Sequence, residues 1–219
     1  MRKFFLASIT LTGLTYLFFG PDEIVDVKIA MKLLPMALIL IYGMATPSLV
    51  STSYKRLILA GLLICMIADG VIYWFMAGLA TFFIGHIFYI AAFRQASRKS
   101  VPLWAAIPLV AYGLLMAAWI AGPQYSAGQT LLGTAIIAYI AVILLMGWMA
   151  IRTRLPFAII GALLFICSDS FLAIDRFVTA LPYRDAWVMV TYYAAQVFIA
   201  SSIENRFVKY SVNPNNLIR

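Results

Sequence analysis

The chain has 219 residues, of which 64% are hydrophobic and only 11% are charged. A soluble domain carries about 25% charged residues, so this composition excludes a soluble globule, a nucleic-acid-binding module and a disordered chain. The sequence therefore predicts an integral membrane protein whose partner is the lipid bilayer and not nucleic acid. The formal net charge of +8 is then explained by basic residues in cytoplasmic loops. The two cysteines, Cys65 and Cys167, lie in apolar runs and indicate neither a disulfide nor a metal pair.

Apolar runs recur eight times along the chain. A helix needs about 20 residues to cross a hydrocarbon layer of about 30 Å, so the pattern predicts an all-α bundle of about eight transmembrane helices in a single domain, residues 1–219. The expected spans are Phe4–Phe19, Val27–Ala45, Leu57–Phe75, Ala80–Phe93, Pro102–Ile120, Gln129–Ile151, Phe157–Phe177 and Ala186–Ile203. No cleavage site of the A-x-A type follows the first span, which we therefore expect to be retained.

Basic residues in alternate loops indicate the orientation of the chain. The even-numbered loops and the two ends hold most of the lysines and arginines: Arg2, Lys3, Lys55, Arg56, Arg94, Arg98, Lys99, Arg152, Arg154, Arg206, Lys209 and Arg219. The first of the other loops is acidic, with Asp22, Glu23 and Asp26. By the positive-inside rule both termini are expected in the cytoplasm, and we expect the membrane to be a bacterial inner membrane.

Two segments of the chain are similar at an offset of 100 residues. The third span reads GLLICMIADG from Gly61 and the seventh reads GALLFICSDS from Gly161, which aligns Asp69 with Asp169. Four spans separate the copies, and an even number of crossings preserves direction. The match predicts a parallel 4+4 repeat. Only three of the ten positions are identical, so chance similarity is the competing explanation.

Four ionisable residues lie inside predicted spans, where a charge costs at least about 2.5 to 3.5 kcal/mol. They are Lys32, Asp69, His86 and Asp169. At 1.5 Å per residue all four fall about 8 to 12 Å below the outer boundary, with Tyr192 and Gln196 of the last span near the same level. We therefore expect a buried polar chamber formed by spans two, three, four, seven and eight. Spans one, five and six contribute no ionisable group at this depth and look like packing or lipid-facing elements.

Alternatives stay open for several of these residues. Lys32 could extend to the outer interface, and His86 could be a satisfied core side chain. A solvated charge run and a phosphate clamp both fit the charged cluster at the outer mouth, which consists of Asp175, Arg176, Arg184 and Asp185.

The residue types present restrict the chemistry. One histidine and two separated cysteines cannot build a three-histidine zinc site, and no G-x-S-x-G, Walker or dinucleotide motif occurs, so we expect neither a metal nor a cofactor. Asp69 and Asp169 point to acid–base catalysis. Burial would keep one carboxyl group protonated beside an ionised one, as in glycosidases. A proton-coupled carrier of a small amphiphile is the alternative, and a protein whose polar layer only sets helix register is a third possibility.

Five segments carry a resemblance to a known family. They are KLLPM from Lys32, ADG around Asp69, GLATFFIGHIFYIAAF from Gly78, GALLFICSDSFLAIDRF from Gly161 and TYYAAQ from Thr191. The sequence resembles the lysoplasmalogenase family of YhhN-like integral membrane proteins. The resemblance implies that a lysophospholipid is hydrolysed at its vinyl ether bond, giving a fatty aldehyde and a glycerophospho-ethanolamine or glycerophospho-choline.

The family is considered to depend on two intramembrane aspartates, and these correspond here to Asp69 and Asp169. The residues expected to bind substrate are Lys32, His86, Arg176, Tyr192 and Gln196. Two departures are visible: Ala68 replaces an expected Gly, and Asp175 stands where Asn is more usual. The second adds a negative charge at the mouth and bears on head-group preference.

Overall fold

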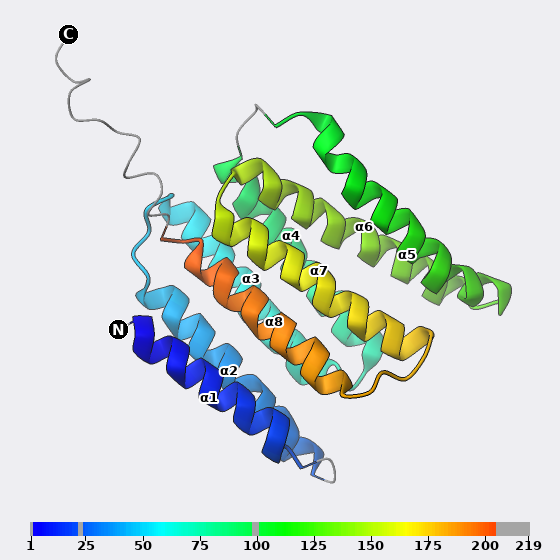
Figure 1. Cartoon of the computed structure of the whole chain (residues 1–219), viewed down its shortest axis with the longest axis horizontal. Helices are drawn as coiled ribbons and strands as arrows, with labels where there is room; N and C mark the ends of the chain where they lie inside the picture. Colours follow the sequence, from blue (N-terminus) through cyan, green and yellow to red (C-terminus); the bar gives the residue numbers. More distant parts are fainter. Residues whose placement is uncertain (1, 22–23, 98–100, 205–219) are drawn as a thin grey trace.

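The computed structural model describes residues 2–21, 24–97 and 101–204, and the regular structure within them is entirely helical. The elements are α1 Arg2–Phe19, α2 Val25–Ala45, α3 Thr52–Val71, α4 Phe75–Ala96, the short 3-10 helix η1 Leu103–Ala106, α5 Ile107–Ser126, α6 Thr130–Thr153, α7 Pro156–Phe177 and α8 Arg184–Ser201. The helices lie alongside one another in an elongated bundle (Figure 1). The predicted all-α fold of about eight helices is confirmed.

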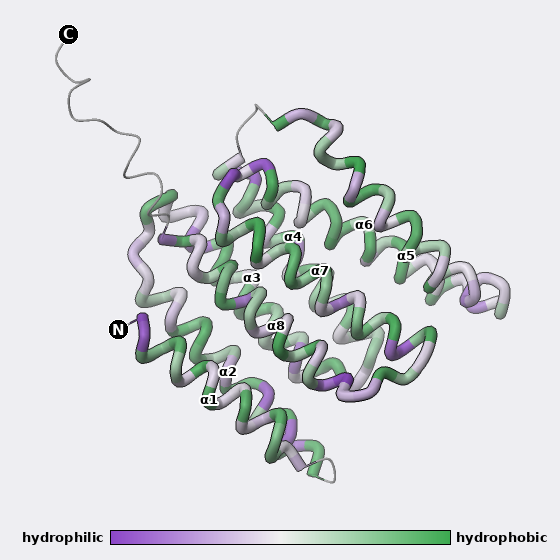
Figure 2. The backbone as a smooth tube through the Cα atoms, viewed as in Figure 1, coloured by the Kyte–Doolittle hydropathy of each residue, from purple (hydrophilic) through white to green (hydrophobic). Residues whose placement is uncertain are grey.

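Five segments are long and apolar enough to cross a membrane. They are α2, α4, the continuous stretch Leu103–Ser126, α6 and α7. Figure 2 shows apolar residues along most of these helices and hydrophilic residues gathered toward the helix ends. The chain is thus an integral membrane protein by the length and composition of its helices. Helices α1, α3 and α8 have similar lengths but carry more polar residues.

The helix boundaries in the structure are set by capping residues and turns and differ from the ends of the apolar runs in the sequence. Helix α3 begins after Ser51, whose hydroxyl accepts a hydrogen bond from the Tyr54 amide at 3.0 Å. This is the usual N-cap interaction. The break between α3 and α4 falls at residues 72–74, so α4 begins at Phe75 and not at the predicted Ala80. Hydrophobicity alone could not show this break, because the apolar run continues through the turn.

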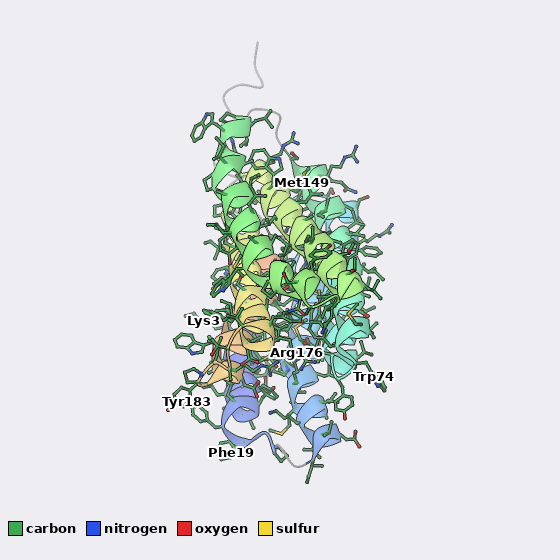
Figure 3. All side chains as sticks on the ribbon, turned by 90° about the vertical axis from the view of Figure 1, so that its right-hand side faces the viewer. Lys3, Phe19, Trp74, Met149, Arg176 and Tyr183 are labelled. Atoms are coloured by element: carbon green, nitrogen blue, oxygen red, sulfur yellow. The ribbon has the colours of Figure 1, made fainter. Side chains whose placement is uncertain are left out.

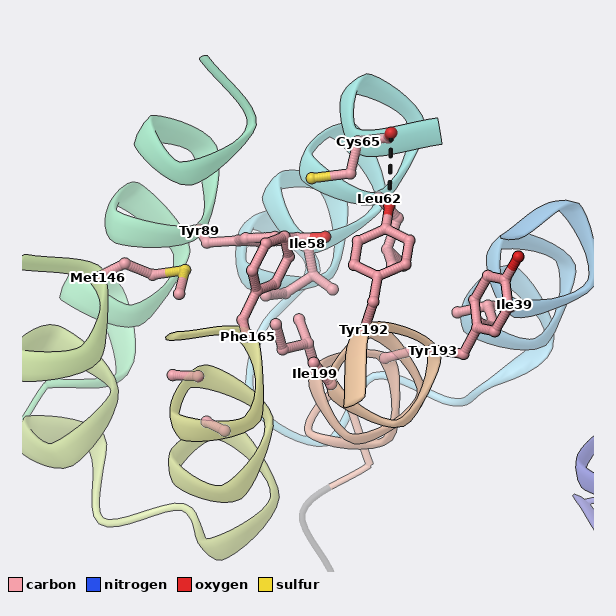
Figure 4. Packing of buried hydrophobic residues seen from close by; sticks show 14 of the residues in the cluster. Ile39, Ile58, Leu62, Cys65, Tyr89, Met146, Phe165, Tyr192, Tyr193 and Ile199 are labelled. Atoms are coloured by element: carbon pink, nitrogen blue, oxygen red, sulfur yellow. Dashed lines mark hydrogen bonds between the residues drawn. The ribbon is translucent and has the colours of Figure 1, made fainter. Parts of the chain in front are cut away.

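Two helical hairpins, α3–α4 and α7–α8, form the centre of the bundle. Helix α2 packs on α3 and α8, and α6 packs on α4 and α7. Helices α1 and α5 lie at opposite edges, against α2 and α6 (Figure 1). The main core joins the hairpins through buried side chains that include Ile58, Leu62, Tyr89, Phe165 and Ile199 (Figure 4).

The glycines of the suggested repeat lie where the helices of each hairpin approach closely. A Cβ atom at Gly61 of α3 would overlap the Tyr89 ring of α4. At Gly161 of α7 it would lie 2.9 Å from the Ala195 carbonyl oxygen of α8. Both glycines therefore permit close helix packing. The 4+4 repeat itself stays a prediction.

The orientation also stays a prediction. Part of its basis lies outside the described residues, namely Asp22, Glu23, Arg98, Lys99, Arg206, Lys209 and Arg219.

We expect Gly161→Ala to destabilise the bundle, because the added methyl group would press on backbone atoms of α8 that cannot move aside. Overpacking of this kind costs about 1 to 3 kcal/mol, which should appear as a lower melting temperature of the purified protein in detergent. The matched control is Gly122→Ala in α5, where a Cβ atom meets nothing within 4 Å. Equal melting temperatures for the two variants would contradict the assignment.

Candidate functional site

A cleft of about 510 Å³ opens among α2, α3, α7 and α8, with α1 and α4 completing its wall. Its charged lining residues are Lys28, Lys32, Asp69, Asp169, Asp175, Arg176 and Arg184, and Tyr16, Tyr73 and Tyr192 add hydroxyl groups. Figure 3 places Arg176 toward the same end of the bundle as Trp74 and Tyr183, away from Met149. Seven charged side chains of both signs thus line one cleft that reaches into an apolar bundle.

Asp69 lies on the cleft wall with both carboxylate oxygens engaged. Lys32 of α2 places its Nζ atom 2.9 Å from Oδ1, and the hydroxyl of Tyr192 of α8 donates to Oδ2 at 2.6 Å. The Asp69 side chain is only 2% exposed. Lys32 points to this carboxylate and not to the outer interface, and its backbone carbonyl accepts a hydrogen bond from Tyr193 at 2.9 Å. The pair is therefore a nearly dehydrated ion pair held by three helices.

Asp169 lines the same cleft but has different partners. The hydroxyl of Tyr139 of α6 donates to its Oδ2 atom at 2.5 Å, and His86 Nε2 of α4 lies 3.7 Å from the same oxygen. Tyr139 and His86 are also within hydrogen-bonding distance of each other, at 3.0 Å. Across the described residues, no Lys or Arg forms an ion pair with Asp169. Its side chain is 16% exposed, so it is more open to the cleft than Asp69.

The prediction that spans one, five and six are packing or lipid-facing elements is wrong for α6 and incomplete for α1 and α5. Helix α6 supplies Tyr139 to Asp169, α5 supplies Tyr112, whose hydroxyl lies 2.5 Å from that of Ser170, and α1 supplies Tyr16 to the cleft wall. The prediction considered only carboxylate, amine and imidazole side chains in those spans and left out the tyrosine hydroxyl groups. Tyr139 lies about 14 Å along α6 from Thr130, so the same depth count applied to tyrosines would have found it.

His86 and Gln196 lie behind the cleft wall. Neither side chain lines the cleft, and both residues are fully buried. Gln196 accepts a hydrogen bond from Tyr89 at 2.7 Å, and the His86 ring packs on Phe165 at a centroid distance of 4.7 Å. His86 Nδ1 and Gln196 Nε2 have no hydrogen-bond partner within the described part of the chain. The substrate contacts predicted for these two residues would therefore require other groups to move.

Tyr192 forms the junction between the polar site and the core. Its ring meets Phe82 and Phe165 edge to face, at centroid distances of 6.0 and 5.4 Å. Figure 4 shows it extending from α8 toward Cys65 of α3, whose carbonyl oxygen is 3.5 Å from the hydroxyl. The rings fix the position of the hydroxyl that holds Asp69.

The cleft mouth is lined by a charged network. Arg184 contacts Asp175 at 3.2 Å and Asp185 at 2.6 Å, and Lys28 contacts Asp185 at 3.0 Å. Lys28 lies one turn before Lys32 on α2, a spacing that could have identified it in the sequence. The Arg176 guanidinium lies 5.2 Å from the centre of the Phe75 ring and forms no ion pair with any carboxylate in the described ranges. Arg176 is therefore a cation available at the mouth.

A metal centre has no support in the part of the chain that the structure describes. No group of three His, Cys, Asp or Glu side chains there could hold an ion. The two serines beside Asp169 are also otherwise engaged: Ser168 donates to the Val188 carbonyl at 2.9 Å and Ser170 to the Ile166 carbonyl at 2.6 Å. Asp69 and Asp169 are thus the two carboxyl groups of the predicted chamber that line the cleft.

Comparison with known proteins agrees with the sequence resemblance. The sequence model of the YhhN family matches residues 27–203. Lysoplasmalogenase TMEM86A of Bos taurus is 33% identical over 168 residues, covering 68% of this chain and 66% of the relative. Lysoplasmalogenase TMEM86B of Sus scrofa is 35% identical over 153 residues, covering 66% of this chain and 62% of the relative. The chain thus spans slightly less than two thirds of these relatives, and no solved structure matches it.

We expect Lys32→Met to lower the melting temperature, because it leaves the Asp69 carboxylate without its counter-charge. Removing one partner of a buried pair costs about 3 kcal/mol. The double variant Lys32→Met/Asp69→Asn should recover most of the loss, since a neutral amide can still bond to Tyr192. Thermal unfolding in detergent measures both effects, and a single variant as stable as the unchanged protein would show that Asp69 does not depend on Lys32.

Proposed function

The chain belongs to the YhhN family, and on that premise we propose that it is a membrane hydrolase that cleaves the vinyl ether bond of lysoplasmalogens. The names of the relatives, lysoplasmalogenase TMEM86A and TMEM86B, support this activity. The observation that carries the proposal is the pair of aspartates in one cleft, one bound to a lysine and the other to a tyrosine hydroxyl. Vinyl ether hydrolysis needs a proton donor and a carboxylate, and this pair can supply both.

The different partners of the two aspartates support different roles for them. Lys32 and Tyr192 both stabilise negative charge on Asp69, which we take as the ionised group. Asp169 has no ion pair with Lys or Arg in the described residues, and Tyr139 occupies only its Oδ2 atom. Its Oδ1 atom is then the position for the acid proton. Asp169 acts as the general acid, and Asp69 as the electrostatic partner and base.

The reaction proceeds in two stages. Asp169 transfers its proton to the alkenyl carbon farther from the ether oxygen, and the carbon bonded to oxygen becomes an oxocarbenium ion that faces the Asp69 carboxylate. Water adds to this carbon and gives up a proton to Asp69, forming a hemiacetal. The hemiacetal collapses to the fatty aldehyde and the glycerol hydroxyl as its own hydroxyl proton passes to the leaving oxygen, and the proton held by Asp69 is transferred through water to Asp169. One water molecule is consumed and both carboxyl groups recover their starting states.

The cleft mouth supplies the contacts for the head group. Arg176 is a cation at the mouth that no carboxylate of the described residues neutralises, and Lys28 and Arg184 lie on the same wall. A phosphate diester carries one negative charge, which a guanidinium can bind through two hydrogen bonds. Asp175 and Asp185 beside these cations favour a head group that also has a positive charge, as ethanolamine and choline do. With both termini in the cytoplasm, this mouth would face the outer side of the membrane.

Asp69→Asn and Asp169→Asn should each abolish aldehyde release from an alkenyl lysophospholipid, because neither amide can donate or accept the catalytic proton. The matched control is Asp26→Asn, an exposed acidic residue of α2 away from the cleft, which should keep full activity. Aldehyde is measured by mass spectrometry with protein purified in detergent. A carrier would release none there because it needs two compartments, and near-normal turnover by either Asn variant would remove that residue from the mechanism.

Tyr139→Phe should lower kcat about 10- to 100-fold, because the lost hydroxyl no longer stabilises the Asp169 carboxylate that proton transfer creates. KM should stay nearly unchanged, since the ring is kept. Tyr125→Phe is the control, because Tyr125 is an exposed residue whose hydroxyl bonds to Thr134. Equal kcat values for the two variants would show that Tyr139 serves only the packing of α6.

A further inference from the structure

A second pocket lies on the other side of Asp169 from the cleft. It is a narrow pocket of about 70 Å³ between α4, α5, α6 and α7. Five residues line both the pocket and the cleft: Ile72, Phe75, Phe82, Asp169 and Leu172. Asp169 therefore lies at the boundary between a wide charged cleft and a narrow pocket.

The wall of the pocket is almost entirely hydrocarbon. Its lining includes Ile136, Ile140 and Ile143 of α6 and Met116 and Ile120 of α5. The few polar groups are bonded to one another: Tyr139 donates to Asp169, and Tyr112 lies 2.5 Å from Ser170. A polar ligand would find few free hydrogen-bond partners here. A hydrocarbon chain needs no such partners, and moving from the lipid into this pocket keeps it in an apolar environment.

The pocket is also elongated and small. From Tyr112 to Ile120 it follows α5 for about 12 Å, and its α6 and α7 residues extend along the same direction. Its volume is much smaller than that of the cleft, at about 70 Å³ against about 510 Å³. A space of this size has no room for two hydrocarbon chains side by side.

We propose that this pocket binds the hydrocarbon chain of the substrate and selects among substrates by the length of that chain. The inference rests on the proposed function. The alkenyl carbons of a lysoplasmalogen lie between the chain and the glycerophospho group, just as Asp169 lies between the pocket and the cleft. A lipid with its head group near Arg176 and its chain in the pocket places the vinyl ether beside Asp169, and a second chain has no place to go.

Ile140 gives the sharpest test because it lines the pocket and makes no contact with the cleft. Ile140→Phe should narrow the pocket and lower kcat/KM for a long alkenyl chain about 10-fold more than for a short one. Ile140→Ala should widen the pocket and improve relative activity on chains with a methyl branch. The control is Ile137→Phe, the same change one turn away on the exposed face of α6, which should keep the original chain-length profile.

A binding measurement separates this inference from the proposed function. A saturated 1-O-alkyl lysophospholipid cannot undergo vinyl ether hydrolysis, so its stabilisation of the protein against heat reports binding alone. Long-chain probes should stabilise the unchanged protein and Ile137→Phe, but not Ile140→Phe. If the unchanged protein binds the probe in this way and releases no aldehyde from alkenyl lipids, the pocket stands and the proposed function fails. If aldehyde is released and both Ile140 variants keep the original profile, the pocket assignment is overturned.

Discussion

The ion pair between Lys32 and Asp69 is the interaction on which the site depends. Bringing two charges into an apolar helix bundle is costly, and the cost is offset only when each charge meets a partner at close range. Here α2 supplies the cation, α3 the carboxylate and α8 the hydroxyl of Tyr192. Correct packing of three helices is therefore a condition for a stable pair, and the pair in turn holds one wall of the cleft.

The two aspartates differ although their sequence contexts are similar. Each lies eight residues after a glycine that allows close packing of its hairpin. The helices that face them are not equivalent, because α2 and α8 bring a lysine and a tyrosine to Asp69, whereas α4 and α6 bring a histidine and a tyrosine to Asp169. Similar local sequence thus gives two carboxyl groups with different electrostatic surroundings, which is what an acid and its charged partner require.

In the proposed function, the position of Asp169 links the chemistry to lipid recognition. On one side lies a wide cleft with lysines and arginines, and on the other a narrow pocket walled by isoleucine and methionine. An amphiphile has the same division between a charged head and an apolar chain. When the head group lies in the cleft and the chain lies in the pocket, the vinyl ether bond between them lies beside Asp169. The difference in polarity between the cleft and the pocket would therefore both bind and orient the substrate.

The all-helical membrane fold follows from the sequence because lipid requires every backbone group to be bonded within its own helix, and the apolar runs are long enough to do so. The cost of a charge in lipid also singled out Lys32, Asp69, His86 and Asp169 from the sequence. Only the tertiary structure showed that Tyr139 bonds to Asp169, that Lys28 pairs with Asp185 and that His86 and Gln196 lie behind the wall. Depth along a helix follows from counting residues, whereas the face that each helix turns to its neighbours depends on packing between distant segments, which no local pattern in one sequence records.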